Sequence, residues 1–361
     1  MRSTKPVSAN RYLYASGRIR ALEIQLLDSG RLNRLHEART IDEINRILTE
    51  SGYPAASDPE TRLSREIVAA YQLMQTLFVE PAYMEILLLF HDFHNLKVIL
   101  KTLTPAWPHR PNADHAVADD LPEASGPYSL LGPSALDPLF RHPSLVDPHI
   151  LFSAVRDRQA AAVPAWLYGA AVQAVRRYQQ SYDVSDIDQY LDRTASGLAL
   201  AKADQIGNLF FSQYLRLQSD LTNLGLLLRT RLLRSGTADL EHVLLPGGSL
   251  PVNRMLDLYG ASTEQIKAAY ASTPVAALAA LADEYGQPGS AGRFSRLADN
   301  LVIGHIRQAR GLWRGPEILL AYLIGREMEI KNIRIALTCL RNGLPSDQAR
   351  EMSRDSYLTW R

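Results

Sequence analysis

Three stretches of this sequence share one pattern: Asp92-Phe-His-Asn95-Leu-Lys-Val-Ile-Leu, Asp220-Leu-Thr-Asn223-Leu-Gly-Leu-Leu-Leu and Glu329-Ile-Lys-Asn332-Ile-Arg-Ile-Ala-Leu. In each copy an acid precedes an asparagine by three residues, and apolar residues occupy the first, fourth and fifth positions after the asparagine. Apolar residues spaced by three and four positions form one face of an α-helix. The pattern therefore predicts three similar amphipathic helices along the chain.

The acid and the asparagine should lie on the buried face of each helix, because each stands one turn before an apolar position. Buried polar groups need hydrogen-bond partners. One interpretation is an acid-based catalytic or ion site, and the other is a structural tie between each helix and a loop or helix end. Repetition in three places favours the structural tie, because a unique site needs only one copy. The repeat residues are Asp92, Asn95, Asp220, Asn223, Glu329 and Asn332.

The remainder of the chain also shows helical spacing. Residues 12–35 carry one apolar stripe, and Thr40, with Glu43 three residues later, is typical of a helix start. Further helices are predicted over about 61–78 and 83–103, and alternation typical of strands is scarce. The sequence predicts an all-α fold.

Two stretches interrupt the helical pattern. Thr104–Pro127 is rich in proline and has no apolar stripe, so we expect an exposed loop or linker there. Leu245–Pro251 is a shorter break that contains Pro246, Gly247 and Gly248. The breaks predict three helical repeat domains, at residues 9–126 (with the proline-rich loop 104–127 at its end), 127–244 and 245–361.

Composition excludes several classes of function. The 39 basic and 38 acidic residues leave a net charge of +1, which argues against a nucleic-acid binder or a polybasic membrane anchor. Cys339 is the only cysteine, so neither an intrachain disulfide nor a cysteine-based zinc site is expected. The longest apolar runs are far shorter than the ~20 residues of a membrane span. We expect neither a membrane span nor a signal peptide.

The sequence contains no pattern that clearly indicates catalytic or metal-binding residues. His91 and His94 flank Asp92, but no third metal ligand is evident, so we interpret both as surface histidines. Asp119-Asp120 is interpreted as part of a solvated acidic loop. The glycines of 286–292 lack the Lys-Ser/Thr ending of a phosphate-binding loop, which indicates a turn. We expect no catalytic residue, no cofactor and no metal ligand, and therefore no enzyme activity.

The three asparagine-centred helices, taken in order, resemble those of the C-subunit family of bacterial and archaeal V-type ATPases and ATP synthases, which includes the d subunit of the eukaryotic enzyme. The opening from Tyr12 to Glu23, the stretch from Ala38 to Tyr53 and the close from Asn342 are similar to the same family. The resemblance extends from about residue 9 to about residue 355. Two features depart from the family pattern: Gly225 replaces the basic residue of the other copies, and the proline-rich loop is long.

The resemblance implies three similar helical domains in a funnel with pseudo-threefold symmetry. It implies a peripheral, hetero-oligomeric component on the cytoplasmic face of a membrane proteolipid ring, with the central shaft of the D and F subunits in its mouth. Such a rotor component couples ion transport to ATP synthesis or hydrolysis and has no active site of its own. The direction of the reaction and the choice of proton or sodium remain open.

Two alternatives compete with this interpretation. A helical scaffold or adaptor of the α-solenoid kind repeats every ~34–47 residues, whereas the asparagines here lie 128 and 109 residues apart. An all-α enzyme of the terpene-synthase kind needs an aspartate-rich helix facing a cavity, and neither Asp92 nor Asp119 offers one. A low-resolution shape with three lobes around an axial opening would distinguish the funnel from both.

Overall fold

The structure is a computed structural model that describes residues 9–104, 120–122 and 132–358. Every regular element in these ranges is a helix, which confirms the all-α prediction. The longest helices are α4 (Pro59–Leu77), α5 (Pro81–Leu103), α8 (Ser185–Ile206), α9 (Leu209–Leu233), α14 (Ser290–Arg307) and α15 (Pro316–Arg341).

Shorter helices connect and cover these long ones. At the N-terminus lie η1 (Ala9–Tyr12), α1 (Leu13–Glu23), α2 (Ser29–Glu37) and α3 (Ile41–Glu50). The middle of the chain contains η4 (Pro133–Leu139), α6 (Pro148–Arg156), η5 (Ala160–Ala162), α7 (Ala165–Ser181), α10 (Thr237–Val243), α11 (Val252–Asp257), α12 (Thr263–Tyr270), α13 (Ala276–Ala279) and η6 (Ala280–Asp283). The last two are η7 (Gln308–Gly311) and α16 (Ser346–Met352).

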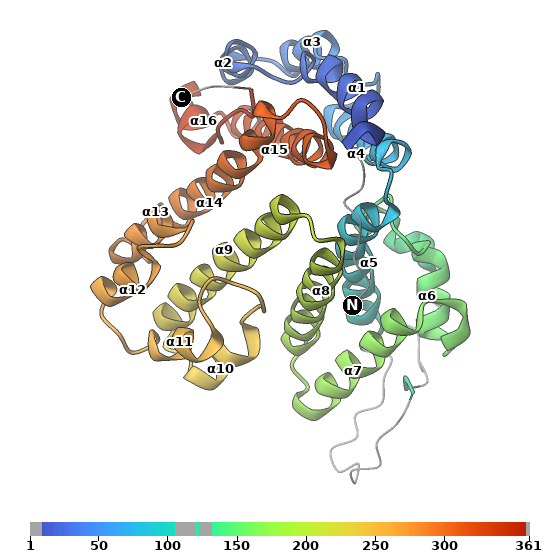
Figure 1. Cartoon of the computed structure of the whole chain (residues 1–361), viewed down its shortest axis with the longest axis vertical. Coiled ribbons are helices and arrows are strands. Elements are labelled where there is room, and N and C mark those ends of the chain that lie inside the picture. The colour runs from blue at the N-terminus through green and yellow to red at the C-terminus, as the bar shows by residue number, and fades with distance from the viewer. Residues whose placement is uncertain (1–8, 105–119, 123–131, 359–361) are drawn as a thin grey trace.

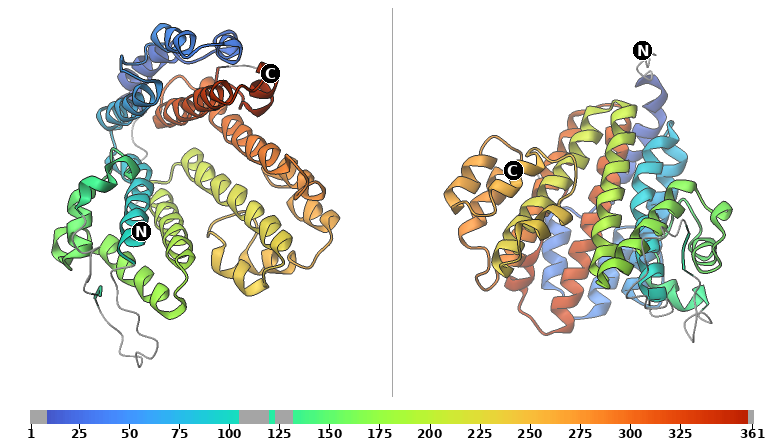
Figure 2. Two further views of the ribbon diagram at one scale, coloured as in Figure 1. Left: turned by 180° about the vertical axis from the view of Figure 1, so that it is seen from behind. Right: turned by 90° about the horizontal axis from the view of Figure 1, so that it is seen from below.

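We group the long helices into three pairs, in which α5 packs on α8, α9 on α14, and α4 on α15. The pairs are joined to one another, because α8 also packs on α9 and α14 also packs on α15. Figure 1 shows the pair α4–α15 at the top, α5–α8 to the right and α9–α14 to the lower left, with the shorter helices outside them. Figure 2 shows the long helices running side by side through the depth of the molecule. The pair α4–α15 joins helices from opposite ends of the sequence. The division at residues 127 and 245 stays a prediction.

Local sequence explains where the helices begin. Thr40 Oγ1 accepts a hydrogen bond from the Glu43 N–H at 3.2 Å and caps α3, as its spacing predicts. Asp58 caps α4 in the same way, with Pro59 in the first turn. The apolar stripe over residues 12–35 is shared by two helices. It divides into α1 and α2, because Asp28 caps a new helix at the Arg31 N–H.

The predicted apolar stripes form the core of the molecule. The residues at the first, fourth and fifth positions after each asparagine are between 0% and 4% exposed. Burial of each leucine or isoleucine in this set stabilises the fold by roughly 1.5–3 kcal/mol. These residues are Leu96, Ile99, Leu100, Leu224, Leu227, Leu228, Ile333, Ala336 and Leu337. In the part of the chain that the structure describes, no helix combines the length and apolar character that membrane crossing requires.

Candidate functional site

The six repeat residues lie on the buried faces of three equivalent helices. Their side chains are between 0% and 6% exposed, so only the protein itself can supply hydrogen-bond partners for their polar atoms. Asp92 Oδ2 has no such partner among the described residues. Asp92 and Asn95 lie on α5, Asp220 and Asn223 on α9, and Glu329 and Asn332 on α15.

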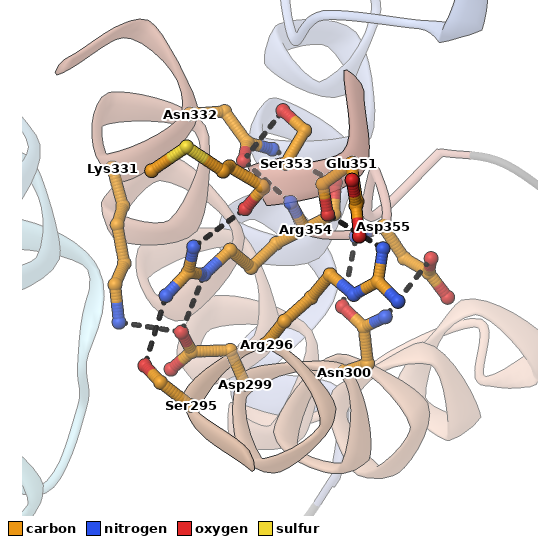
Figure 3. Close-up of polar contacts among 11 residues, drawn as sticks. Ser295, Arg296, Asp299, Asn300, Lys331, Asn332, Glu351, Ser353, Arg354 and Asp355 are labelled. Atoms are coloured by element: carbon orange, nitrogen blue, oxygen red, sulfur yellow. Dashed lines mark hydrogen bonds and ion pairs between the residues drawn. The ribbon is translucent and has the colours of Figure 1, made fainter. Parts of the chain in front are cut away.

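Each asparagine makes two hydrogen bonds to the backbone of a single residue further along the chain, an arrangement that we call the asparagine clasp. The partners are Arg141 for Asn95, Leu245 for Asn223 and Arg354 for Asn332. The backbone N–H of the partner donates to the side-chain oxygen at 2.7, 2.8 and 2.8 Å in that order. The side-chain amide donates to the carbonyl oxygen of the same partner at 3.1, 2.9 and 3.1 Å. Figure 3 includes the third clasp.

The clasped residues occupy equivalent places in the fold. Each follows a helix of seven residues, namely η4, α10 or α16, and lies two residues beyond its end. The chain then continues along the long helix as a return segment, which we define as residues 140–147, 244–251 and 353–358. The repeat therefore consists of a long helix, a short helix and a return segment held by the clasp.

The first copy of this repeat contains extra residues. Its asparagine and clasped residue are 46 residues apart, whereas the distance is 22 residues in the second and third copies. The difference equals the length of the proline-rich stretch Thr104–Pro127. Most of that stretch lies outside the described residues, but Leu121 is buried against the helices around α5. The long loop thus corresponds to an insertion into a shared repeat.

The first two acids hold the same return segments as their asparagines. Asp92 Oδ1 accepts from the backbone N–H groups of Leu145 and Val146, both at 3.1 Å. The Asp220 carboxylate accepts from the N–H of Ser249 at 2.6 Å and from its hydroxyl at 2.5 Å. Each acid therefore binds the segment four or five residues beyond the clasped residue.

The third acid binds a different part of the chain. Glu329 accepts hydrogen bonds from the Leu27 N–H and, at 2.6 Å, from the Tyr53 hydroxyl, both of which belong to the N-terminal segment. Arg326 is 1% exposed and donates to the same carboxylate at 2.5 Å. The extra methylene of glutamate gives the longer reach. At this copy the motif joins α15 to the N-terminal segment.

Further contacts strengthen the junction between the two ends of the chain. The Ser356 hydroxyl donates to the Leu27 carbonyl oxygen at 2.6 Å, and the Tyr357 hydroxyl donates to the Glu23 carboxylate at 2.9 Å. The pair α4–α15 is therefore completed by both terminal segments together.

Burial changes the titration of two of the acids. It raises the pKa of Asp92 to about 7, against the opposing effect of the two N–H groups that it accepts. It also raises the pKa of Asp220, against the hydrogen bonds from Ser249. Asp92 is 0% exposed, so no substrate reaches its carboxyl group in this conformation. The raised pKa is therefore a consequence of burial and does not indicate a catalytic acid.

The residue two positions after each asparagine faces the partner helix of the pair. Lys97 forms an ion pair with Asp192 of α8 at 2.7 Å, and Arg334 forms one with Glu60 of α4 at 3.1 Å. In the middle copy a Cβ on Gly225 would lie 3.3 Å from the Phe294 ring of α14. The departure at Gly225 therefore replaces an ion pair by close packing against an aromatic ring.

The other candidate residues of the sequence have structural partners. His91 and His94 are half-buried rather than on the surface, and they contact backbone carbonyl oxygens of Pro143 at 2.6 Å and Leu139 at 3.1 Å. Burial lowers the pKa of His91 to about 4. Asp120 accepts from the Tyr168 hydroxyl at 2.5 Å, whereas Asp119 lies outside the described residues.

Gly286 and Gly289 lie at positive φ in the turn that leads into α14, and Gly292 lies in the first turn of that helix. In the part of the chain that the structure describes, no three or more His, Cys, Asp or Glu side chains gather in a way that could hold a metal ion. The candidate site is thus a set of backbone anchors.

The turns between the long helices converge at one end of the molecule, which we call the closed end. Asn208, in the turn between α8 and α9, donates to Glu317 at the start of α15 with a distance of 2.8 Å. The Tyr83 ring, near the start of α5, lies 5.3 Å from the Phe211 ring of α9. The Gly315 N–H, before α15, donates to the Ser16 hydroxyl of α1 at 3.1 Å.

Exposed apolar side chains surround the closed end and were not predicted from the sequence. Tyr14 is 73% exposed, Leu209 70% and Trp313 69%. Together with Leu13 and Leu312 they form a set that we call the apolar rim. The sequence offers one signal for it, because Trp313 stands in a turn of glycine and arginine, where burial is not expected.

A second surface lies between α8 and α9. It is a groove of about 650 Å³ that extends from Leu200 and Tyr214 to Asp188 and Arg229. Asp188 is near the start of α8 and Arg229 near the end of α9, so the groove reaches toward the end of the molecule opposite the closed end. Its walls combine apolar side chains with charges of both signs.

Comparison with known proteins identifies relatives over nearly the whole chain. The profile of a family described as ATP synthase (C/AC39) subunit matches residues 15–131 and 133–352. The C subunit of a V-type sodium ATPase from Enterococcus hirae is 22% identical over 345 residues, which cover 94% of this chain and 97% of that protein. The C subunit of an A-type ATP synthase from Thermococcus onnurineus is 20% identical over 369 residues, which cover 96% of this chain and 90% of that protein.

Proposed function

The chain belongs to the ATP synthase (C/AC39) subunit family and is a component of a V/A-type ATPase complex, and on that premise we propose that it is a non-catalytic part of the central rotor. In this role it is peripheral to the membrane, on its cytoplasmic face, and links the proteolipid ring to the central shaft of the D and F subunits. It thereby couples ion transport to ATP synthesis or hydrolysis. The three helical repeats form the funnel that this role requires.

A part that transmits torque must resist deformation between its two attachment surfaces. The repeated clasps support this role, because each fixes a return segment to a long helix through buried hydrogen bonds. The junction of the two terminal segments at Glu329 completes the pair α4–α15, so both are held to the frame. The proposal depends on one observation: a single frame presents two separate surfaces, an apolar rim at the closed end and a groove that reaches toward the opposite end.

The apolar rim is the surface that we assign to the proteolipid ring. Exposed apolar clusters on water-soluble helices are typical of interaction sites. Trp313 and Tyr14 are residue types that favour the boundary between membrane and water, where the loops of a ring lie. The guanidinium of Arg314 stacks over the Trp313 ring at 3.8 Å and adds a positive charge beside it.

The groove between α8 and α9 is the surface that we assign to the shaft. It lies between two long helices and reaches toward the end away from the rim. Its mixed apolar and charged lining suits an interface that must be specific for one partner. Tyr214 and Leu200 provide apolar area, and Asp188 and Arg229 provide charges of both signs.

Co-purification of the protein from native membranes tests this assignment. A double variant, Leu209→Glu with Trp313→Glu, should lose the proteolipid ring and retain the D and F subunits, because two charges then occupy the rim. Ile150→Glu is a matched control, since Ile150 is 52% exposed on α6, away from the rim. Retention of the ring by the double variant, or loss of all partners by the control, would contradict the assignment.

A further inference from the structure

A pocket lined with arginines lies where the two ends of the chain meet. It has a volume of about 500 Å³ and is bounded by α2, the first half of α14, α16 and the third return segment. Its polar lining comes from helices more than 250 positions apart in sequence. The polar side chains of this lining include Asn33, Arg293, Arg296, Asn300, Arg350 and Arg354.

Of the four arginines that line the pocket, Arg296 is the one whose positive charge nearby carboxylates neutralise least. Its guanidinium donates to the backbone carbonyl oxygen of Glu351 at 2.5 Å, and it forms no ion pair with a described carboxylate. Figure 3 shows this side chain beside Asn300 and Arg354. A carbonyl oxygen carries only a partial charge, so the positive charge of Arg296 remains available to a ligand in the pocket.

Two further arginines have only weak partners. Arg293 pairs with Glu284 at 2.9 Å and Arg350 pairs with Asp347 at 3.0 Å, but those carboxylates are 53% and 90% exposed. Arg350 also pairs with Glu37, whose side chain is 60% exposed. Exposed pairs of this kind contribute little and exchange readily for a better partner.

The remaining walls of the pocket do not cancel this charge. Arg354 is held by Asp299 at 2.7 Å, so it contributes structure and not free charge. Asp355 is the acid among the lining residues, and Arg307 pairs with it at 3.8 Å. His36 also lines the pocket, and its pKa is lowered by burial and by Arg350, so it is uncharged at neutral pH.

We propose that this pocket binds a compact oxyanion of the phosphate type. Guanidinium groups match the geometry of phosphate oxygens and donate in pairs. Arg296, Arg293 and Arg350 approach from two different helices, and Asn33 of α2 lines the pocket from its other side. The proposal is independent of the rotor role, because it depends only on these groups.

Binding there would join the two terminal segments of the chain. The anion contacts α2 on one side and α14 with α16 on the other, beside the return segment that Asn332 holds. Ligands that bind only the folded state stabilise it by mass action. The bound protein should therefore unfold at a higher temperature than the free one.

Calorimetric titration of the purified full-length chain with inorganic pyrophosphate, at constant ionic strength, tests the proposal. The wild type should bind one equivalent, and Arg296→Gln should bind at least about tenfold more weakly, because one charge-assisted pair of hydrogen bonds is lost. Arg65→Gln is the matched control. Arg65 is exposed and donates to the Ala55 carbonyl oxygen at 2.8 Å, so the same charge and the same kind of bond are removed elsewhere.

Vesicle flotation distinguishes the two sources of such an anion. One outcome is that the protein binds vesicles of phosphatidic acid and phosphatidylcholine, that pyrophosphate displaces it from them, and that Arg296→Gln abolishes this binding. That outcome would identify the anion as a lipid head group. Pyrophosphate binding without flotation would identify a soluble anion. No heat of binding, or equal affinity in the wild type, Arg296→Gln and Arg65→Gln, would overturn the proposal. Circular dichroism of each variant excludes unfolding as the cause of lost binding.

Discussion

Asparagine suits the clasp because its side chain carries one donor group and one acceptor, which match a backbone C=O and N–H. Leucine has a similar size and offers neither. Each of Asn95→Leu, Asn223→Leu and Asn332→Leu should lower the free energy of unfolding by about 1–3 kcal/mol, since a buried N–H and a C=O lose their partner. Urea denaturation of the three variants measures this loss.

The control for that series is Asn253→Leu, at an exposed position in α11. It should change the unfolding free energy by no more than about 0.5 kcal/mol. A clasp variant that kept full stability but lost a specific activity would show that its asparagine is functional rather than structural.

Asp92 gives the fold a dependence on pH. Its pKa is raised to about 7 in the folded protein, whereas an aspartate in an unfolded chain titrates near ~3.9. The folded state therefore holds the proton more tightly, and this stabilisation is fully present below pH ~4. It is lost as the pH rises through about 7.

The comparison with Asp92→Asn isolates this effect, because all other titrating groups are shared. The unfolding free energy of the wild type minus that of Asp92→Asn should fall as the pH rises from about 4 to about 7. Urea denaturation at several pH values measures it. A difference that stays constant over this range would show that burial does not raise the pKa of Asp92.

At the scale of elements, the long helices were predictable and their anchors were not. The spacing of apolar residues after Asn95, Asn223 and Asn332 predicts α5, α9 and α15 and their buried faces. The clasped residues have no common side chain, because the asparagine binds their backbone atoms. No motif in the sequence could therefore reveal Arg141, Leu245 or Arg354 as partners.

The break inside the apolar stripe of residues 12–35 could not be predicted, for a related reason. The chain leaves the helix at residues 24–28, and the Leu27 N–H becomes a donor to Glu329, far away in sequence. Local periodicity contains no information about such a distant partner. The apolar rim was missed because exposure depends on how the three turns come together.

The second return segment depends on a glycine for its approach to α9. A Cβ at Gly248 would lie 2.7 Å from the Asp220 Oδ1 and 3.3 Å from the Asn223 Nδ2. Gly248→Ala should therefore displace the segment from both repeat residues and lower the unfolding free energy by about 1–3 kcal/mol. Thermal and urea denaturation measure the loss.

A matched change at Gly292 should act in the opposite direction. Gly292 lies in the first turn of α14, and a Cβ there would have no atom within 4 Å. Gly292→Ala should be neutral or stabilise by up to about 1 kcal/mol, because alanine favours the helix. Equal behaviour of the two alanine variants would contradict a steric requirement at Gly248.

At the scale of the whole molecule, the two terminal segments complete one of the three helix pairs. Leu27 and Tyr53 meet Glu329 of α15, and the third return segment contacts Glu23 of α1 and Leu27. The chain is thereby closed into a frame in which the same kind of anchor occurs three times. In the role that we propose, this closure lets one protein present a ring surface and a shaft surface without a flexible joint between them.

In the role that we propose, this protein carries torque between the shaft and the membrane ring. To test this role, the protein is removed from reconstituted vesicles that contain the complete complex, and ATP turnover and the ion gradient are followed together. ATP hydrolysis by the catalytic head should continue, ion pumping should stop, and adding the purified chain back should restore pumping. Ion pumping that persists undiminished without the protein would contradict the rotor role.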